Sequence, residues 1–286
     1  MSEKTILFYV SLGLLLAGCS RSSYLASPAD FPTEAPVSME EPTPTEASSD
    51  PLTITIVYDN IPHDPHLTAD LGFGAYIQYH DQAILFDTGR DGQILLENMQ
   101  TLDIDPASVQ AVVLSHPHND HIGGLADFLE VSSQPPVYLL ATFDDSFIER
   151  TQQATEVIEA MPGQEIATDI LTSGEISGDI PEQVLVIRTR KGLVVITGCA
   201  HPGIVRIVER GIELTGEPVY MVMGGFHLGE ASEDEIEAII EDLKRLGVQA
   251  VAPSHCTGEL ATRMFAEEYG EDFISTGVGS VITIDN

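Results

Sequence analysis

Short apolar runs separated by turn residues extend from Thr53 to the end of the chain. Residues 52–58 alternate like a half-buried strand, and residues 74–80 and 82–86 have the pattern of a hairpin. Similar runs predict strands at 111–114, 137–141, 183–187, 193–197, 219–223, 248–252 and 281–284. Helical patterns occupy 91–99, 124–130, 147–161 and 260–269, and a capping box opens another helix at Ser232. Because strands and helices are mixed along the chain, the pattern favours a layered α/β domain over an all-β sandwich.

The first residues of the chain have a different pattern. Lys4 is the only basic side chain before an apolar run at residues 6–17. This run is too short to span a bilayer as a stable anchor and is typical of a signal-peptide core. The sequence Leu-Ala-Gly-Cys at residues 16–19 resembles a bacterial lipobox, which implies a signal peptide over residues 1–18 and lipid attachment at Cys19. An ordinary secretory signal and an uncleaved anchor are the alternatives.

Residues 19–52 are rich in proline, serine, threonine and glutamate, and no basic residue occurs between Arg21 and Arg90. Such a stretch cannot bury enough apolar surface to offset the entropy of ordering it, so we expect an acidic disordered linker. The catalytic domain is then expected over residues 53–286. Export would place it on the bacterial cell membrane or outer membrane, facing the periplasm or the exterior.

Acidic residues outnumber basic ones by 45 to 12, which gives a formal net charge of −33. An acidic surface repels nucleic-acid phosphates, so nucleic-acid binding is disfavoured. A metal site can still attract an anionic substrate, because the charge of the ions dominates locally. We therefore expect a small-molecule substrate, and no sequence feature indicates an oligomeric state.

A cluster of metal-binding side chains follows the apolar run at residues 111–114. Three histidines and an aspartate lie within the six residues from His116 to His121. Imidazole with carboxylate is the ligand mixture that zinc prefers and that iron and manganese tolerate. The spacing of His116 and His118 aims both side chains the same way along an extended backbone, which leaves Asp120 and His121 for a second ion. The sequence thus predicts two divalent ions, with zinc favoured.

The pattern His-x-His-x-Asp-His at residues 116–121 resembles the signature of the metallo-β-lactamase superfamily. Phe-Asp-Thr-Gly at residues 86–89 matches an earlier motif of that family, in which Asp87 would support the metal ligands. Pro-Ser-His at residues 253–255 matches a late histidine at a strand end. The resemblance implies a four-layer αββα sandwich of two mixed β-sheets flanked by helices.

The middle of the chain departs from the commonest family pattern. No histidine occurs between His121 and His201, where many members place a third ligand. Thr-Gly-Cys at residues 197–199 falls where many relatives have Thr-Gly-Asp, whose aspartate bridges both metals. This element, with the motifs at 224–228 and 253–258, resembles a subgroup whose named members are dihydropterin ribofuranosyl-aminobenzene phosphate synthases and whose other members are called metallo-hydrolases.

The resemblance implies two ligand sets, which are His116, His118 and His201 for the first ion and Asp120, His121 and His255 for the second. Asp120 is also expected to orient the attacking water, and His227 is expected to contact the substrate or its leaving group. Cys199 is expected to pack beside the site as a small buried residue, with ligation as the alternative. The remaining histidines, His63, His66 and His80, follow no ligand pattern and are expected on the surface.

The predicted activity is hydrolysis of a phosphoester, ester or lactone by water activated between two metal ions. Three alternatives remain: a pterin-linked synthase, an iron-dependent redox enzyme on the same fold, and a non-catalytic binding lipoprotein. The export signal disfavours the synthase, because pterin intermediates are cytosolic. The intact ligand set disfavours the binding protein.

Overall fold

Residues 50–285 are described by the structure, which is a computed structural model. The predicted signal peptide, the lipidation site Cys19 and all but the end of the predicted linker lie outside these residues. Within residues 50–285, every helix is too short or too polar to cross a membrane.

Seven strands form the first sheet. In spatial order they are β13 (Val281–Ile284), β1 (Leu52–Asp59), β2 (Phe73–Tyr79), β3 (Gln82–Phe86), β4 (Ala111–Val113), β5 (Val137–Leu139) and β6 (Val157–Glu159). The pairs from β13 to β3 are antiparallel, and the pairs from β3 to β6 are parallel. The first sheet is therefore mixed.

Six strands form the second sheet. In spatial order they are β12 (Ala250–Ser254), β11 (Val219–Gly225), β10 (Gly192–Thr197), β9 (Leu185–Thr189), β8 (Ile170–Thr172) and β7 (Glu165–Ala167). The strands β10, β11 and β12 are parallel, so their carboxyl ends meet at one edge, whereas β7 to β10 pair antiparallel. This sheet is mixed as well.

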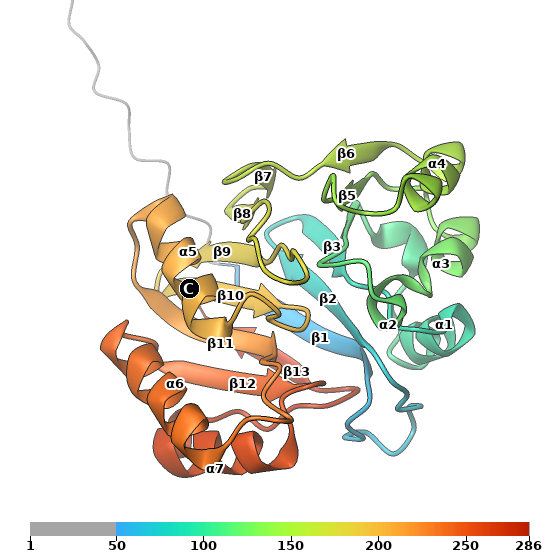
Figure 1. The fold of residues 1–286 in the computed structure, drawn as a ribbon. Helices are drawn as coiled ribbons and strands as arrows, with labels where there is room; N and C mark the ends of the chain where they lie inside the picture. The colour runs from blue at the N-terminus through green and yellow to red at the C-terminus, as the bar shows by residue number, and fades with distance from the viewer. Residues whose placement is uncertain (1–49, 286) are drawn as a thin grey trace, which may run out of the picture. The chain divides into compact units, whose positions relative to one another are not determined.

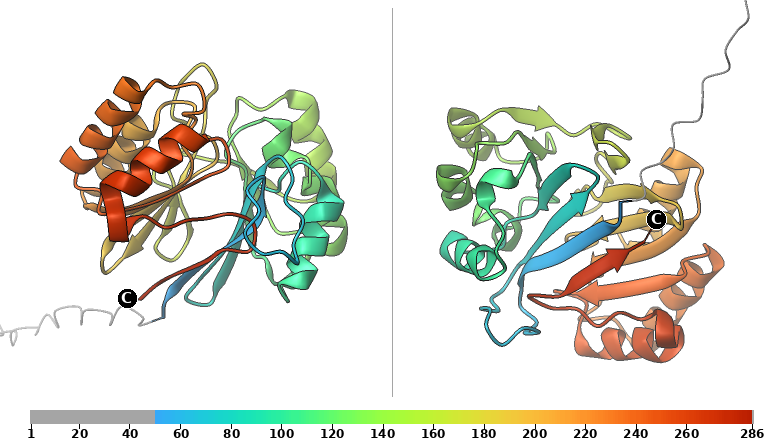
Figure 2. Two further views of the ribbon diagram at one scale, coloured as in Figure 1. Left: turned by 90° about the horizontal axis from the view of Figure 1, so that it is seen from below. Right: turned by 180° about the vertical axis from the view of Figure 1, so that it is seen from behind.

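Helices cover the outer face of each sheet, as Figures 1 and 2 show. The first sheet carries α1 (Gly92–Thr101), α3 (Leu125–Val131) and α4 (Asp145–Ala154), and the second carries α5 (Ile204–Thr215), α6 (Glu233–Arg245) and α7 (Glu259–Tyr269). Short helical turns are α2 (Asn119–Ile122), η1 (Pro106–Ser108) and η2 (Gly270–Asp272). The predicted αββα sandwich is confirmed.

Three apolar cores separate the four layers. The core between the sheets includes Ile77 and Ile196. A second core, which includes Phe265, joins the second sheet to its helices, and a third, which includes Phe128, joins the first sheet to α1 and α3. Strands such as β10 are buried on both faces, which explains why they occur in the sequence as continuous apolar runs.

The predicted helix at residues 147–161 is wrong in its second half. Helix α4 ends at Ala154, and β6 follows because Val157 and Ile158 pair in parallel with β5. Helix α5 and strands β7 and β8 were not predicted, and β12 begins later than the predicted strand at 248–252. Strands of three residues are too short to show an alternation of apolar and polar positions in the sequence. Pairing with neighbouring strands determines whether they form.

Candidate metal centre

The candidate ligands lie in segments that follow strands of both sheets. His116, His118, Asp120 and His121 follow β4. From the second sheet, His201 follows β10 and His255 follows β12. Parallel pairing through β11 brings the carboxyl ends of β10 and β12 to one edge of the second sheet, and contacts of His116 and His121 with His201 and His255 show that the segment after β4 lies against that edge. Residues far apart in the sequence thus meet at one rim.

The first predicted ligand set forms a compact group. His116 Nε2 lies 3.1 Å from His118 Nδ1 and 3.2 Å from His201 Nε2. A tetrahedral zinc ion with bonds of about 2.0–2.1 Å separates two nitrogen ligands by about 3.4 Å. Burial lowers the pKa of all three imidazoles, and that of His201 falls to about 4. Three neutral imidazoles whose ring nitrogens converge in this way can bind one metal ion through their lone pairs.

The second predicted set also converges. His121 Nε2 lies 3.2 Å from His255 Nε2, and Asp120 Oδ2 lies 3.7 Å and 3.5 Å from these two nitrogens. Burial raises the pKa of Asp120, but the hydrogen bond from His255 and the nearby imidazoles outweigh it and hold the pKa below its usual range. The ring centroids of His116 and His121 are 4.2 Å apart, so the two sets adjoin. Two imidazoles and a carboxylate fit a second divalent ion.

Asp87 orients one histidine of each set. Its carboxylate accepts hydrogen bonds from the backbone N–H of Ser115, from Ser115 Oγ and from His121 Nδ1, each at 2.7 Å. Ser115 Oγ lies 2.8 Å from His116 Nδ1. Because the hydroxyl hydrogen of Ser115 is used in the hydrogen bond to Asp87, its oxygen accepts a hydrogen bond from His116 Nδ1. These contacts engage Nδ1 of both imidazoles and leave Nε2 facing the other candidate ligands. That Asp87 supports metal ligands in this way stays a prediction.

His255 is held in a similar way by Asn60. Its Nδ1 lies 2.7 Å from Asn60 Oδ1, and Asn60 Nδ2 donates to the backbone carbonyl of His255 at 3.2 Å. These contacts join the end of β12 to the end of β1. They leave His255 Nε2 facing Asp120 and His121.

Among residues 50–285, four of the eight non-glycine residues with positive φ lie around this centre. They are Asp87 (57°), Ala200 (62°), His227 (54°) and His255 (50°). Such conformations cost on the order of 1–3 kcal/mol each and persist where the surrounding structure enforces them. Their grouping here supports a functional role for this rim of the sandwich.

Glu182 was missed by the sequence analysis. Its side chain is fully buried, and Oε1 accepts hydrogen bonds from the backbone N–H groups of residues 198, 199 and 200, each at 3.0 Å. Oε2 accepts from the N–H of His201 at 2.9 Å. One carboxylate thus fixes the whole loop that carries Cys199 and His201. The one sequence feature that could indicate a structural role for Glu182 is its position just before the buried strand β9.

Two thiols lie beside the ligands, and both are free. Cys199 is buried with Sγ 3.3 Å from His121 Nε2, and Cys256 Sγ lies 3.5 Å from the carbonyl oxygen of Cys199. Its hydrogen bond with Cys256 and its burial raise the pKa of the Cys199 thiol. The structure thus places Cys199 in contact with a predicted metal ligand.

His227 lies on the exposed side of the centre. Its ring centroid is 4.3 Å from that of His201, and a hydrogen bond with Cys256 raises the pKa of its imidazole. His63 and His66 are exposed, as expected, and His80 is half-buried beside Asp169. Neither His63, His66 nor His80 belongs to a candidate metal group among residues 50–285.

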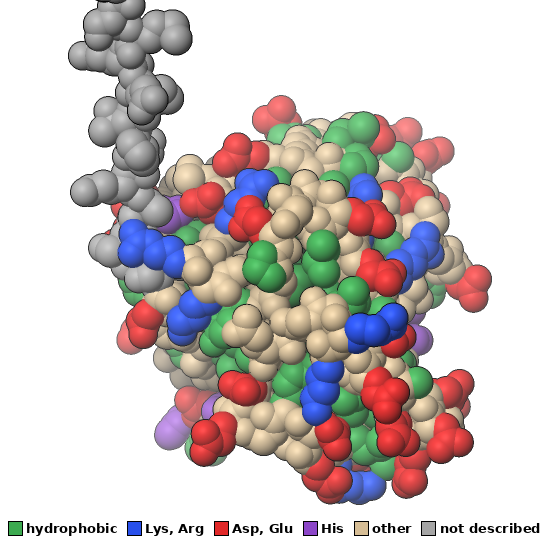
Figure 3. Space-filling model, turned by 90° about the vertical axis from the view of Figure 1, so that its left-hand side faces the viewer, with side chains coloured by type: hydrophobic (Ala, Val, Ile, Leu, Met, Phe, Trp, Pro, Cys, Tyr) green, Lys and Arg blue, Asp and Glu red, His purple; other side chains and the backbone are tan. Residues whose placement is uncertain are grey.

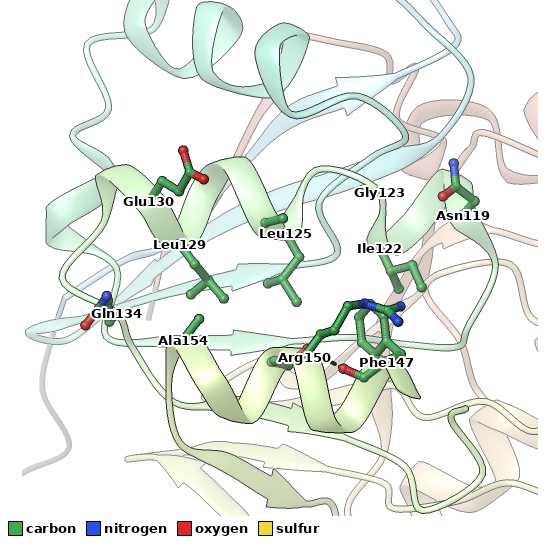
Figure 4. A pocket seen from close by; sticks show the side chains of 12 residues that line it. Asn119, Ile122, Gly123, Leu125, Leu129, Glu130, Gln134, Phe147, Arg150 and Ala154 are labelled. Carbon is green, nitrogen blue, oxygen red and sulfur yellow. Dashed lines mark hydrogen bonds between the residues drawn. The ribbon is translucent and has the colours of Figure 1, made fainter. Parts of the chain in front are cut away.

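Of two cavities, the first borders the centre through His255, whereas the second has no candidate metal ligand in its lining. One, of about 620 Å³, is lined by His255, Asn60, Thr262 and Arg263 among others. The other, of about 470 Å³, lies between α3 and α4, where Figure 4 shows Arg150 beside apolar side chains of both helices. Volumes of this size suit small-molecule ligands.

The chain resembles known proteins over most of its described length. A family model described as the metallo-beta-lactamase superfamily matches residues 68–145. A 7,8-dihydropterin-6-methyl-4-(beta-D-ribofuranosyl)-aminobenzene-5'-phosphate synthase of Methanocaldococcus jannaschii is 34% identical over 245 residues, which cover 70% of this chain and 83% of that protein.

Solved structures show the same relationship. Tm1679, described as a metal-dependent hydrolase of the beta-lactamase superfamily, is 30% identical with a TM-score of 0.71, over 82% of this chain and 100% of that one. The short form of human tRNase Z, at 14% identity and a TM-score of 0.58 over 82% of this chain and 100% of that one, shares the fold. The chain belongs to the metallo-beta-lactamase superfamily.

Proposed function

We propose that this protein is a hydrolase that uses two divalent metal ions, preferably zinc, to cleave a phosphoester, ester or lactone. The observation that carries the proposal is the convergence of six predicted ligands into two adjoining sets, in which five pairs of donor atoms lie 3.1–3.7 Å apart. When bound, such an ion pair lowers the pKa of a shared water and stabilises negative charge that develops on the attacked centre.

The surrounding side chains have separate tasks in this proposal. Asp120 remains partly exposed, so its carboxylate can accept a hydrogen bond from the attacking water while it holds the second ion. His227, on the exposed side of His201, is placed to contact the substrate and to give a proton to the leaving group. Asp87 and Asn60 keep the ligating histidines in position.

A substrate screen with metal analysis tests this function. Purified full-length protein in mild detergent is assayed against chromogenic phosphodiester, phosphomonoester, lactone and β-lactam compounds, and its metal content is measured on the same sample. We expect turnover of a phosphoester or lactone that a chelator abolishes and zinc restores. A protein that carries two zinc ions yet turns over none of these compounds would contradict the proposal, and bound iron with visible absorption would favour redox chemistry.

A synthase activity is the second candidate, because the archaeal relative at 34% identity is named as one. We test it by incubating the same protein with ribofuranosyl-aminobenzene phosphate and a 6-methyl-7,8-dihydropterin that carries a leaving group on its methyl carbon, and by following the product named for that relative by mass spectrometry. Formation of that product, without hydrolysis in the screen, would replace the first proposal.

We propose a small-molecule substrate rather than a nucleic acid. The net charge of −33 supports this proposal, because it opposes binding of a polyanion. Acidic side chains are spread over the face that Figure 3 shows, with basic ones scattered among them rather than gathered in one stripe.

We further propose that the protein is exported and anchored to a bacterial membrane through lipid on Cys19, which the sequence around this residue supports. Replacing Cys19 by serine is expected to leave the chain unprocessed and without lipid, because the variant lacks the thiol that accepts the lipid. Diacylation at this thiol supplies the two acyl chains that stable membrane anchoring needs. Detergent phase separation measures the effect: wild type enters the detergent phase and the variant does not gain lipid mass. Equal recovery of both proteins in the aqueous phase, without lipid, would rule the anchor out.

A further inference from the structure

The Cys199 thiol lies where the two ligand sets meet. Its sulfur is within 4.8 Å of the donor nitrogens of His116 and His201, and equally within 4.8 Å of those of His121 and His255. Among the described residues, Cys199 is the one side chain shared by both of these candidate metal groups. Its place in the centre therefore joins the first set to the second.

The backbone fixes the sulfur in this place. Glu182 holds the N–H groups on both sides of Cys199, and Ala200 turns the chain with a φ of 62°. A Cβ at Gly198 would lie 2.2 Å from Ser115 Oγ, and a Cβ at Gly225 would lie 3.1 Å from Cys199 Cα. Glycine at both positions lets this loop pack directly against the network that orients the histidines.

Packing alone does not account for these neighbours. A cysteine that serves only as a small hydrophobe contacts apolar side chains, whereas this sulfur faces imidazole nitrogens, with His121 Nε2 at 3.3 Å. Sulfur and nitrogen ligands of one tetrahedral zinc ion, with bonds of about 2.3 Å and 2.0–2.1 Å, lie about 3.6 Å apart. Two ions separated by about 3.5–4 Å can share one such sulfur.

We propose that Cys199 binds both metal ions as a bridging thiolate, in the position where many superfamily members have a bridging aspartate. The inference rests on the proposed dinuclear function, and it replaces the expectation that Cys199 is merely packed beside the site. On metal binding the S–H bond breaks, the proton leaves to solvent, and two lone pairs of the sulfur bind one ion each. A bridging sulfur favours zinc or cobalt over the harder manganese ion.

Cobalt substitution tests the bridge with a readout other than activity. Metal-free full-length protein is loaded with Co²⁺, and binding stoichiometry is measured together with the near-ultraviolet charge-transfer absorption that arises only from a thiolate–cobalt bond. We expect two Co²⁺ per chain and an intense thiolate band. Cys199→Asp should keep two ions, because a carboxylate can bridge, but lose the band. Cys256→Ser changes the second thiol of the centre, which forms a candidate metal group with Cys199 and His227, and it should keep both the two ions and the band.

Several outcomes would overturn the inference. Two bound cobalt ions without a thiolate band in wild type, or a band that survives in Cys199→Asp, would exclude Cys199 as the bridge. A band lost only in Cys256→Ser would assign the bond to Cys256. Failure to bind two ions at all would instead overturn the proposed dinuclear function.

Discussion

Replacing His116 by alanine is expected to remove the first metal ion and to lower kcat/KM by about a thousandfold or more, while the fold survives. His116 is the donor that lies close to both other members of its set, at 3.1 Å and 3.2 Å, so its loss leaves two ligands without their common neighbour. The sandwich persists because its three apolar cores do not depend on this side chain. Metal analysis and kinetics on the same sample measure the effect.

His63→Ala is the matched control, because His63 is an exposed histidine outside the candidate metal groups. It should retain two ions and the wild-type rate. His121→Ala should behave like His116→Ala but lose the second ion, and it also leaves the buried Asp87 carboxylate without one of its partners. A His116→Ala protein with two metal ions per chain and full turnover would show that the ligand assignment is wrong.

Glu182→Gln is expected to cost about 2–4 kcal/mol of unfolding free energy and to weaken metal binding by roughly 10- to 100-fold. The carboxylate is fully buried and accepts four backbone N–H hydrogen bonds, three on Oε1 and one on Oε2. Glutamine keeps the shape but has only one acceptor oxygen, so its NH₂ group faces a backbone N–H. The loop that carries Cys199 and His201 must then shift.

Chemical denaturation and zinc titration together test this role of Glu182. The control is Glu237→Gln, on the exposed face of α6, which should change the unfolding free energy by less than about 0.5 kcal/mol. If Glu182→Gln bound zinc with wild-type affinity and kept its stability, the loop would not depend on the carboxylate. Loss of stability with unchanged zinc affinity would show a structural role without positioning of the ligands.

The part of the centre that could be predicted from the sequence is the part built locally. His116, His118, Asp120 and His121 are close in the sequence because one loop after β4 carries them all. His201 and His255 were predicted from their motifs, and the structure brings both to the same rim. The αββα fold followed from the same resemblance and is confirmed. Whether these six residues hold metal stays a prediction.

What could not be predicted depends on contacts between distant segments. Glu182 acts through backbone N–H groups of residues 198–201, and backbone partners leave no pattern in the sequence. The central place of Cys199 arises only when the loops after β4, β10 and β12 converge. The sequence pattern predicts helix at residues 157–159, but pairing with β5 outweighs this weak local preference and makes the segment strand β6.

Anomalous diffraction at the zinc edge, from crystals of the zinc-loaded protein, tests the dinuclear centre most directly. We expect two peaks at the rim of the sandwich. The ligands of the first should be His116, His118 and His201, those of the second Asp120, His121 and His255, and Cys199 should lie between the two peaks. A single peak, or peaks bound by side chains outside this set of seven, would contradict the dinuclear centre.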